Sequence, residues 1–186
     1  GKYNTMDAAL RHAEQMVREG ADVLDVGGES TRPGHVQISD EEEAQRVVPV
    51  IRAPKKEFDV PVSVDTYKSY VAVAALDAGA DLVNDIWGLK YDGRMASVIA
   101  EYSAACCLMH NREKAEYHAF LPDFMEDMRE CIRLAENAGI RRDGILLDPG
   151  VGFGKTCEMN LEIISRLEIM HELRYPILLG TSRKSV

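Results

Sequence analysis

The most constraining feature of this sequence is a regular alternation of short apolar runs with longer amphipathic stretches. Each run is four or five residues long and is followed by polar residues. Such runs are typical of buried strands, and amphipathic stretches of about 8 to 20 residues are typical of helices. We predict strands at 23–26, 62–65, 82–86, 105–109, 145–148 and 177–180. We predict helices at 5–19, 40–52, 67–78, 95–102, 122–138 and 159–173.

The residues between these elements support the alternation. Gly20, Gly79 and Gly139 stand where helix C-terminal glycines belong, shortly before a predicted strand. Asp40 with Glu43 predicts a capping box at the start of the second helix. Strict alternation of strands and helices predicts the α/β class. Strand ends recur about every 31 residues, the size of one unit of a (β/α)8 TIM barrel, and no glycine-rich nucleotide fingerprint favours a doubly wound sheet instead.

The number of predicted strands is too small for a whole barrel. Eight units need eight strands, but six are readable, and a helix precedes the first of them. We therefore expect one domain over residues 1–186, an incomplete barrel covering about strands 2 to 7. The first strand and the last helix–strand–helix segment would be missing. Unpaired strand edges predict that these residues alone are poorly active or unstable.

Composition excludes some classes of function. With 22 basic and 31 acidic residues, the net charge is −9, which argues against nucleic acid as a partner because phosphate backbones select basic surfaces. No apolar run approaches the roughly 18 residues of a membrane helix. None of the four cysteines forms a Cys-x-x-Cys pair, which predicts buried, reduced thiols and a cytoplasmic protein.

Polar side chains follow almost every predicted strand, where a barrel collects its chemistry. The sharpest group consists of Asp65, Asn84, Asp148 and Lys184. Carboxylates accept hydrogen bonds, an ammonium donates them, and an amide can both donate and accept. Together they would suit a flat heterocycle with amino and carbonyl groups along its edge. Taken singly, each aspartate could equally stabilise a strand–helix junction.

Three loops carry further candidates. Residues 30–34, Ser-Thr-Arg-Pro-Gly, offer a hydroxyl and a guanidinium that suit phosphate, although an ordinary loop would look similar. Residues 182–185, Ser-Arg-Lys-Ser, would open a helix, where an anion is favoured. Residues 150–156 resemble a phosphate-binding loop but fail its spacing, so we interpret them as a tight loop with Phe153 as an apolar wall. His110 follows a strand and could line the site.

Six segments, in order, resemble the successive motifs of the dihydropteroate synthase family of pterin-binding enzymes. They are residues 25–34, 63–66, 84–86, 108–110, 147–156 and 182–185. The resemblance implies a transferase that condenses 6-hydroxymethyl-7,8-dihydropterin pyrophosphate with p-aminobenzoate to give 7,8-dihydropteroate and pyrophosphate. A pterin-binding methyltransferase barrel and a non-catalytic pterin-binding remnant are the alternatives.

The resemblance also implies roles for individual residues. Asp65 and Lys184 would be catalytic. The pterin would be bound by Asp65, Asn84, Ile86, Met109, Asp148, Phe153 and Lys184. Thr31 and Arg32 would bind the pyrophosphate. The p-aminobenzoate would contact Pro33, Phe153, Lys184 and Ser185.

The family further implies a magnesium ion and a homodimer. The asparagine that the family links to magnesium lies on the first strand, so we expect no metal ligand within these residues. The other expected partners are the two small-molecule substrates, with neither nucleic acid nor membrane.

Overall fold

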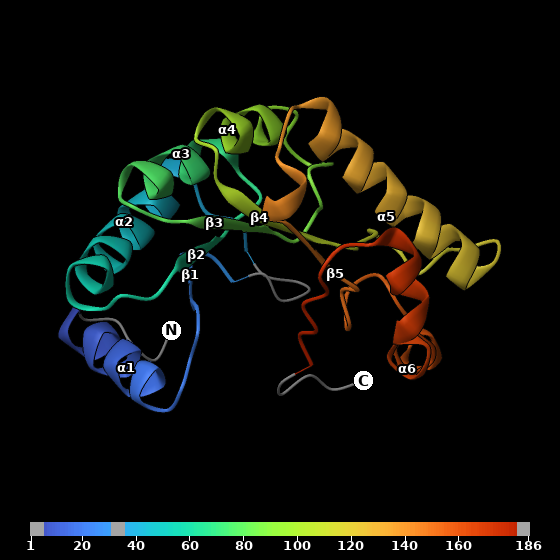
Figure 1. Cartoon of the computed structure of the whole chain (residues 1–186), viewed down its shortest axis with the longest axis horizontal. Helices are drawn as coiled ribbons and strands as arrows, with labels where there is room; N and C mark the ends of the chain where they lie inside the picture. Colours follow the sequence, from blue (N-terminus) through green and yellow to red (C-terminus); the bar gives the residue numbers. More distant parts are fainter. Residues whose placement is uncertain (1–5, 31–35, 182–186) are drawn as a thin grey trace. The chain divides into compact units, whose positions relative to one another are not determined.

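The structure is a computed structural model that describes residues 6–30 and 36–181. Contacts between Cα atoms divide the chain into two compact units, Gly1–Asn84 and Asp85–Val186. Each unit is built from strands and helices in alternation (Figure 1). No helix of the described residues is both long and apolar enough to cross a membrane. The prediction of one domain stays a prediction.

The first unit carries three parallel strands. Its elements are α1 (Met6–Arg18), β1 (Leu24–Gly27), α2 (Asp40–Glu57), β2 (Val62–Asp65), α3 (Ser69–Asp77) and most of β3 (Leu82–Asp85). The valines Val26, Val64 and Val83 alternate with the polar residues along the strands, so they share the opposite face. Helix α2 packs against β1, β2 and α3 (Figure 1). This arrangement leaves the polar strand residues on the face away from the helices.

A cluster of buried charged side chains lies next to the carboxyl end of β1. The ammonium of Lys68 lies 2.8 Å from Glu29 Oε2 and 2.8 Å from Glu43 Oε2, and all three side chains are almost fully buried. Lys68 also donates to the carbonyl oxygen of Ile38, and Tyr67 donates its hydroxyl hydrogen to Glu29. Two buried acids therefore share one lysine, which makes that lysine necessary for their burial.

The second unit contains α4 (Met95–Glu101), β4 (Ala105–Met109), α5 (Phe120–Asn137), β5 (Ile145–Asp148) and α6 (Cys157–Ser165). Strands β4 and β5 pair in parallel. Short 3-10 helices occupy Arg142–Gly144 and Leu167–Leu173. The amphipathic helix α5 buries one face through Phe124, Met125, Met128, Cys131, Ile132 and Ala135.

Most of the predicted elements are confirmed within a few residues. The strands at 62–65, 105–109 and 145–148 have the predicted bounds. Gly20, Gly79 and Gly139 adopt positive φ angles of 97°, 106° and 85°, as helix-ending glycines do.

Several predicted bounds are wrong. Helix α2 continues to Glu57 because Val47, Ile51 and Pro54 are buried on one of its faces, and this packing outweighs the two prolines within it. The predicted helix 159–173 ends as an α-helix at Ser165 and continues as a 3-10 turn. The predicted strand 177–180 is reduced, within the described residues, to one parallel bridge between Ile177 and Leu147.

The predicted capping box at Asp40 is also wrong. The N-cap is Ser39, whose hydroxyl accepts the backbone N–H of Glu42 at 3.1 Å, so Asp40 is already the first helical residue. Cysteine burial holds for Cys106, Cys107 and Cys131, but Cys157 is exposed at the start of α6. All four are free thiols.

Candidate functional site

Asp65 and Asn84 lie side by side at the carboxyl ends of β2 and β3. They are register partners, so their side chains leave the sheet on the same face. The amide nitrogen of Asn84 also approaches Asp25 Oδ2 at 3.5 Å, and Asp25 lies on β1, on the other side of β2. In the first unit, the strands thus bring the predicted site residues Asp65 and Asn84 together with a second carboxylate, that of Asp25.

Asp25 is a polar strand residue that the sequence prediction left out of the site. The residue as a whole is exposed, but protein atoms closely surround its carboxyl group. This desolvation raises the pKa of Asp25, and hydrogen bonds with Ser63 and Asn84 oppose the rise. The signal that could have found it is its position within a predicted strand, on the face shared with Asp65.

Met109 and Asp148 are paired in the same way at the carboxyl ends of β4 and β5. They are register partners, with exposed fractions of 4% and 6%. Asp148 Oδ1 accepts the backbone N–H of Gly150 at 2.7 Å, which is the junction role left open by the sequence. A carboxylate offers about four acceptor sites, so this hydrogen bond is compatible with ligand binding.

The glycine-rich loop after β5 folds tightly over the end of β4. Gly150 and Gly154 adopt φ angles of 67° and 54°. A Cβ atom on Gly150 would lie 1.9 Å from the carbonyl oxygen of His110, so only glycine fits there. The ammonium of Lys155 turns back onto the carbonyl oxygens of Gly150 and Phe153, at 3.0 and 2.9 Å. This geometry supports the interpretation of a tight loop, and it leaves Phe153 half-buried at the loop's tip.

His110 is fully buried beneath this loop. Its Nε2 atom lies 3.0 Å from Asp127 Oδ2, and its Nδ1 atom lies 2.9 Å from Lys155 Nζ. Arg112 donates to both oxygens of Asp127. Burial lowers the pKa of His110 to about 4, so the ring is neutral at pH 7. The hydrogen bonds of His110 and Arg112 hold the pKa of Asp127 well below its usual range, against the opposing effect of burial.

Asp85, the last residue of β3, fixes the turn that follows. Its carboxylate accepts the backbone N–H groups of Trp87 and Leu89 at 2.8 and 2.9 Å, and the residue is fully buried. Burial raises its pKa to about 6. The turn begins at Ile86, a predicted pterin contact, which is 6% exposed.

Five predicted site residues lie outside the described residues: Thr31, Arg32, Pro33, Lys184 and Ser185. The pair Asp65 and Asn84 belongs to the first unit and the pair Met109 and Asp148 to the second. That the two pairs meet around one ligand stays a prediction.

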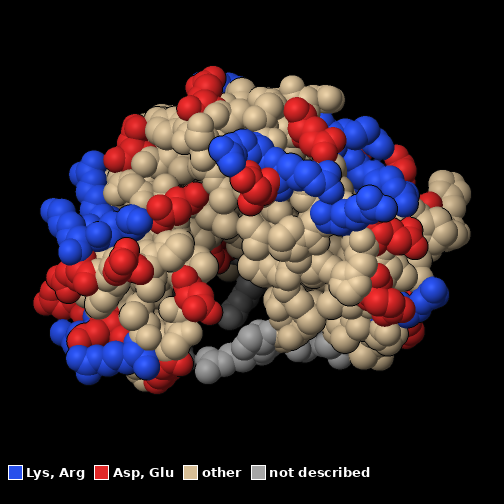
Figure 2. Space-filling model, viewed as in Figure 1, with Lys and Arg blue, Asp and Glu red and all other residues tan. Residues whose placement is uncertain are grey.

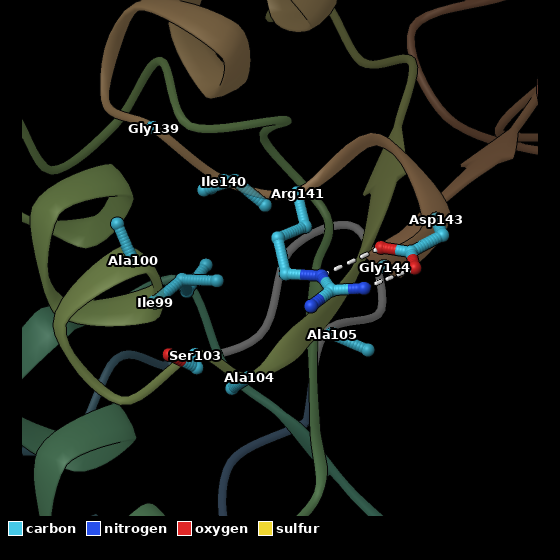
Figure 3. A pocket seen from close by; sticks show the side chains of 10 residues that line it. All are labelled: Ile99, Ala100, Ser103, Ala104, Ala105, Gly139, Ile140, Arg141, Asp143 and Gly144. Atoms are coloured by element: carbon cyan, nitrogen blue, oxygen red, sulfur yellow. Dashed lines mark hydrogen bonds and ion pairs between the residues drawn. The ribbon is translucent and has the colours of Figure 1, made fainter.

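A pocket of about 250 Å³ lies at the other end of the second unit (Figure 3). It lies beside Ala105, the first residue of β4, and Gly144, which precedes β5, whereas Met109 and Asp148 end these strands. The guanidinium of Arg141 at this pocket is already paired with Asp143 (Figure 3). Since barrel enzymes work at the carboxyl ends of their strands, we do not assign the site to this pocket.

Among the described residues, no three or more His, Cys, Asp or Glu side chains gather into a group that could hold a metal ion.

Figure 2 shows acidic and basic side chains next to one another in several places on the visible face.

The whole chain, residues 1–186, matches the family model described as pterin binding enzyme. It is 56% identical to the dihydropteroate synthase of Clostridium beijerinckii, over all of this chain and 69% of that protein. It is 51% identical to that of Bacillus subtilis, over 99% of this chain and 65% of that protein. The chain belongs to the dihydropteroate synthase family. Members of this family are transferases of folate biosynthesis.

Solved structures of dihydropteroate synthases are also similar to this chain. One from Clostridium difficile, crystallised in the presence of pteroic acid, is 49% identical, with a TM-score of 0.95 over 99% of this chain and 70% of that one. One from Yersinia pestis, in a sulfonamide drug complex, is 40% identical, with a TM-score of 0.92 over 99% and 69%. These matches confirm the predicted α/β class and TIM barrel fold. This chain spans about 70% of the Clostridium difficile chain, which agrees with an incomplete barrel.

Proposed function

We propose that the polar strand ends of this chain bind a pterin and that the chain takes part in the dihydropteroate synthase reaction. In this reaction, the arylamine nitrogen of p-aminobenzoate attacks the methylene carbon of the pterin pyrophosphate. The new C–N bond forms as the C–O bond to pyrophosphate breaks, and the amine nitrogen loses a proton. No nucleophile from the protein is needed, so the chain's residues would bind and orient the substrates and stabilise the departing charge.

The chemistry of Asp65, Asn84 and Asp148 supports this proposal. A carboxylate can accept two parallel N–H groups from a guanidine-like ring edge, and an amide can both donate and accept. Asp65 and Asn84 are already aligned in register, and Asp148 is buried at the end of β5. We assign the heterocycle edge to these three side chains.

The apolar residues supply the other part of the binding surface. Met109 and Ile86 are buried at the ends of β4 and β3, and Phe153 is half-buried in the glycine-rich loop. A flat ring gains from such walls through burial of its faces and contact with a polarizable sulfur. We propose these three side chains as the contacts of the pterin ring.

The residues outside the described ranges complete the proposal. Thr31 and Arg32 would bind pyrophosphate through a hydroxyl and a guanidinium. Pro33, Phe153, Lys184 and Ser185 would contact p-aminobenzoate. Asp65 and Lys184 keep their proposed catalytic role, as the groups that hold the reacting pterin in position.

Three finer assignments also remain proposals. We propose that magnesium would accompany the pyrophosphate and, when bound, would supply positive charge that favours the departing anion. We also propose a homodimer and a cytoplasmic location. Analytical ultracentrifugation tests the dimer, and pyrophosphate release with and without magnesium tests the metal.

The observation that carries the proposal is the pairing of Met109 with Asp148 and of Asp65 with Asn84 at strand ends. Isothermal titration with 6-hydroxymethylpterin should show binding to the chain. Asp148→Asn should weaken binding about 10-fold or more, because it removes a charged acceptor. The matched control is Asp143→Asn, an exposed aspartate at the amino end of β5, which should leave affinity unchanged.

Equal affinity of Asp148→Asn and the unaltered chain would refute the assignment. Turnover is tested separately, by release of pyrophosphate from pterin pyrophosphate and p-aminobenzoate. A chain extended at both ends to the length of its relatives should turn over faster than these 186 residues. Equal rates would contradict the expectation that residues 1–186 alone are poorly active.

A further inference from the structure

We propose that Lys155 is a positioning residue that holds the glycine-rich loop, and with it Phe153, in the conformation that faces the pterin. It would act through a fixed chain of hydrogen bonds to His110 and Asp127. The inference rests on the proposed pterin contact of Phe153 and deepens it, because it names what keeps that side chain in place.

The ammonium of Lys155 closes the loop on itself. Its Nζ atom lies 3.0 Å from the carbonyl oxygen of Gly150, 2.9 Å from that of Phe153 and 2.9 Å from Nδ1 of His110. An ammonium has three N–H donors, and these three acceptors match them in number. The two carbonyl groups stand at opposite ends of the loop's tip, and the backbone N–H of Phe153 also donates to the carbonyl oxygen of Gly150 at 3.1 Å. The cation adds a second link across this turn and joins it to His110.

The charges determine which nitrogen of His110 carries the proton. Asp127 is ionised, because the pKa of its carboxyl is held low, and its oxygens can only accept. The Nε2 atom of His110 therefore donates to Asp127. The ring is neutral, so Nδ1 has no hydrogen and accepts from Lys155. The order of donation runs from Lys155 through His110 to Asp127.

Asp127, at the end of this series of hydrogen bonds, is also held in place. Arg112 lies with its Nε atom 2.6 Å from Asp127 Oδ2, and its guanidinium stacks 4.2 Å from the ring of Tyr117. The hydroxyl of Tyr117 donates to the carbonyl oxygen of Gly154 at 2.7 Å. The loop is thus tied to helix α5 through Lys155 and to the segment before α5 through Tyr117.

The surroundings of the lysine make its contacts strong. The ring of Phe124 lies 5.9 Å from Lys155 Nζ and 4.6 Å from the ring of His110, and Phe124 is fully buried. Hydrogen bonds of a charged donor are stronger where water is excluded. If the lysine is removed, the carbonyl oxygen of Phe153 and the ring nitrogen of His110 lose this donor, and the carbonyl oxygen of Gly150 keeps only the backbone N–H of Phe153. The loop then loses its connection to His110, although Tyr117 still holds Gly154.

The test uses the whole 186-residue chain and a double-mutant cycle. We compare Lys155→Met, Phe153→Ala and the double variant for binding of 6-hydroxymethylpterin by calorimetry. Lys155→Met should weaken binding about 10-fold, since loss of a charged hydrogen bond costs roughly that much. The pterin affinity of the double variant should lie within about 2-fold of the affinity of Phe153→Ala, because both changes act on one contact. Lys114→Met, an exposed lysine of the same unit, is the control and should bind normally.

A second readout does not depend on pterin binding. Nitrogen-15 NMR of the unaltered chain at pH 7 should show His110 as the neutral tautomer with its hydrogen on Nε2, and Lys155→Met should shift the Nδ1 resonance. If the unaltered chain binds no pterin, the proposed function fails, while the NMR result still tests the hydrogen-bond chain. If Lys155→Met does not fold, Lys155→Gln, which keeps two N–H donors, takes its place with a smaller expected loss.

Three results would overturn the inference. One is unchanged affinity in both lysine variants, the second is fully additive losses in the double variant, and the third is a hydrogen on Nδ1 of His110. Additive losses would mean that Lys155 supports the fold without positioning Phe153.

Discussion

His110 should make the stability of this protein depend on pH in a defined window. In an unfolded chain, a histidine has a pKa of about 6.5. Burial in the folded protein lowers this pKa to about 4. As the pH falls from 7 towards 4, the unfolded chain therefore binds a proton that the folded chain does not bind, and the folded state loses stability. At pH 4.5 the loss from this residue is about 2.5 kcal/mol, at 1.36 kcal/mol for each pKa unit.

Asp85 has the opposite effect on stability over part of the same pH range. Its folded pKa of about 6 lies above the ordinary value of 3.8, so the folded chain binds a proton first and gains stability as the pH falls from 6 to 3.8. The pH dependence of the unaltered chain therefore contains two opposing contributions. A comparison with His110→Gln cancels the contribution of Asp85 and leaves that of His110.

The assay is urea unfolding followed by circular dichroism at pH 7, 5.5 and 4.5, at constant ionic strength. At pH 7, His110→Gln should be less stable than the unaltered chain, because the contacts with Asp127 and Lys155 are altered. The difference should shrink by about 2.5 kcal/mol at pH 4.5, since glutamine does not titrate. His118→Gln is the matched control, because that histidine is fully exposed. A difference that stays constant with pH would refute the buried, neutral state of His110.

Two further predictions concern stability. Gly150→Ala should destabilise the chain by about 2 kcal/mol or more, measured by urea unfolding, because its new Cβ atom would collide with a backbone carbonyl group at a positive φ angle. Gly139→Ala, which also has a positive φ angle but no atom within 4 Å, should cost about 1 kcal/mol, and equal costs would contradict the steric argument. Lys68→Met should cost about 3 to 5 kcal/mol, because it leaves two buried glutamates without their cation. A loss of less than about 1 kcal/mol, as for an exposed lysine such as Lys56, would contradict their burial.

The strands were predictable because their signal is local. Runs such as 62–65 and 145–148 are apolar, short and followed by polar residues, and the structure confirms their bounds. The end of α2 was not predictable in this way. Its prolines argue for an earlier end, and burial of Val47 and Ile51 against other elements overrides them.

The candidate site also contains residues that the sequence could predict and residues that it could not. The pairs Asp65 with Asn84 and Met109 with Asp148 follow from strand periodicity, because parallel strands place their ends at one edge. Asp127 gave no sequence signal, since an acid in an amphipathic helix is typical of a solvated face. Its contact with His110 joins the middle of α5 to the end of β4, and only the tertiary structure brings these together.

We propose that Asp65, Asn84 and Asp148 bind the edge of one pterin ring. A crystal structure of the chain with bound 6-hydroxymethylpterin tests this most directly. We expect all three side chains to lie within hydrogen-bond distance of the ring's polar edge, with Met109 against its face. A well-defined pterin that contacts only one of the two strand-end pairs, or that lies in the pocket at the amino ends of β4 and β5, would contradict it.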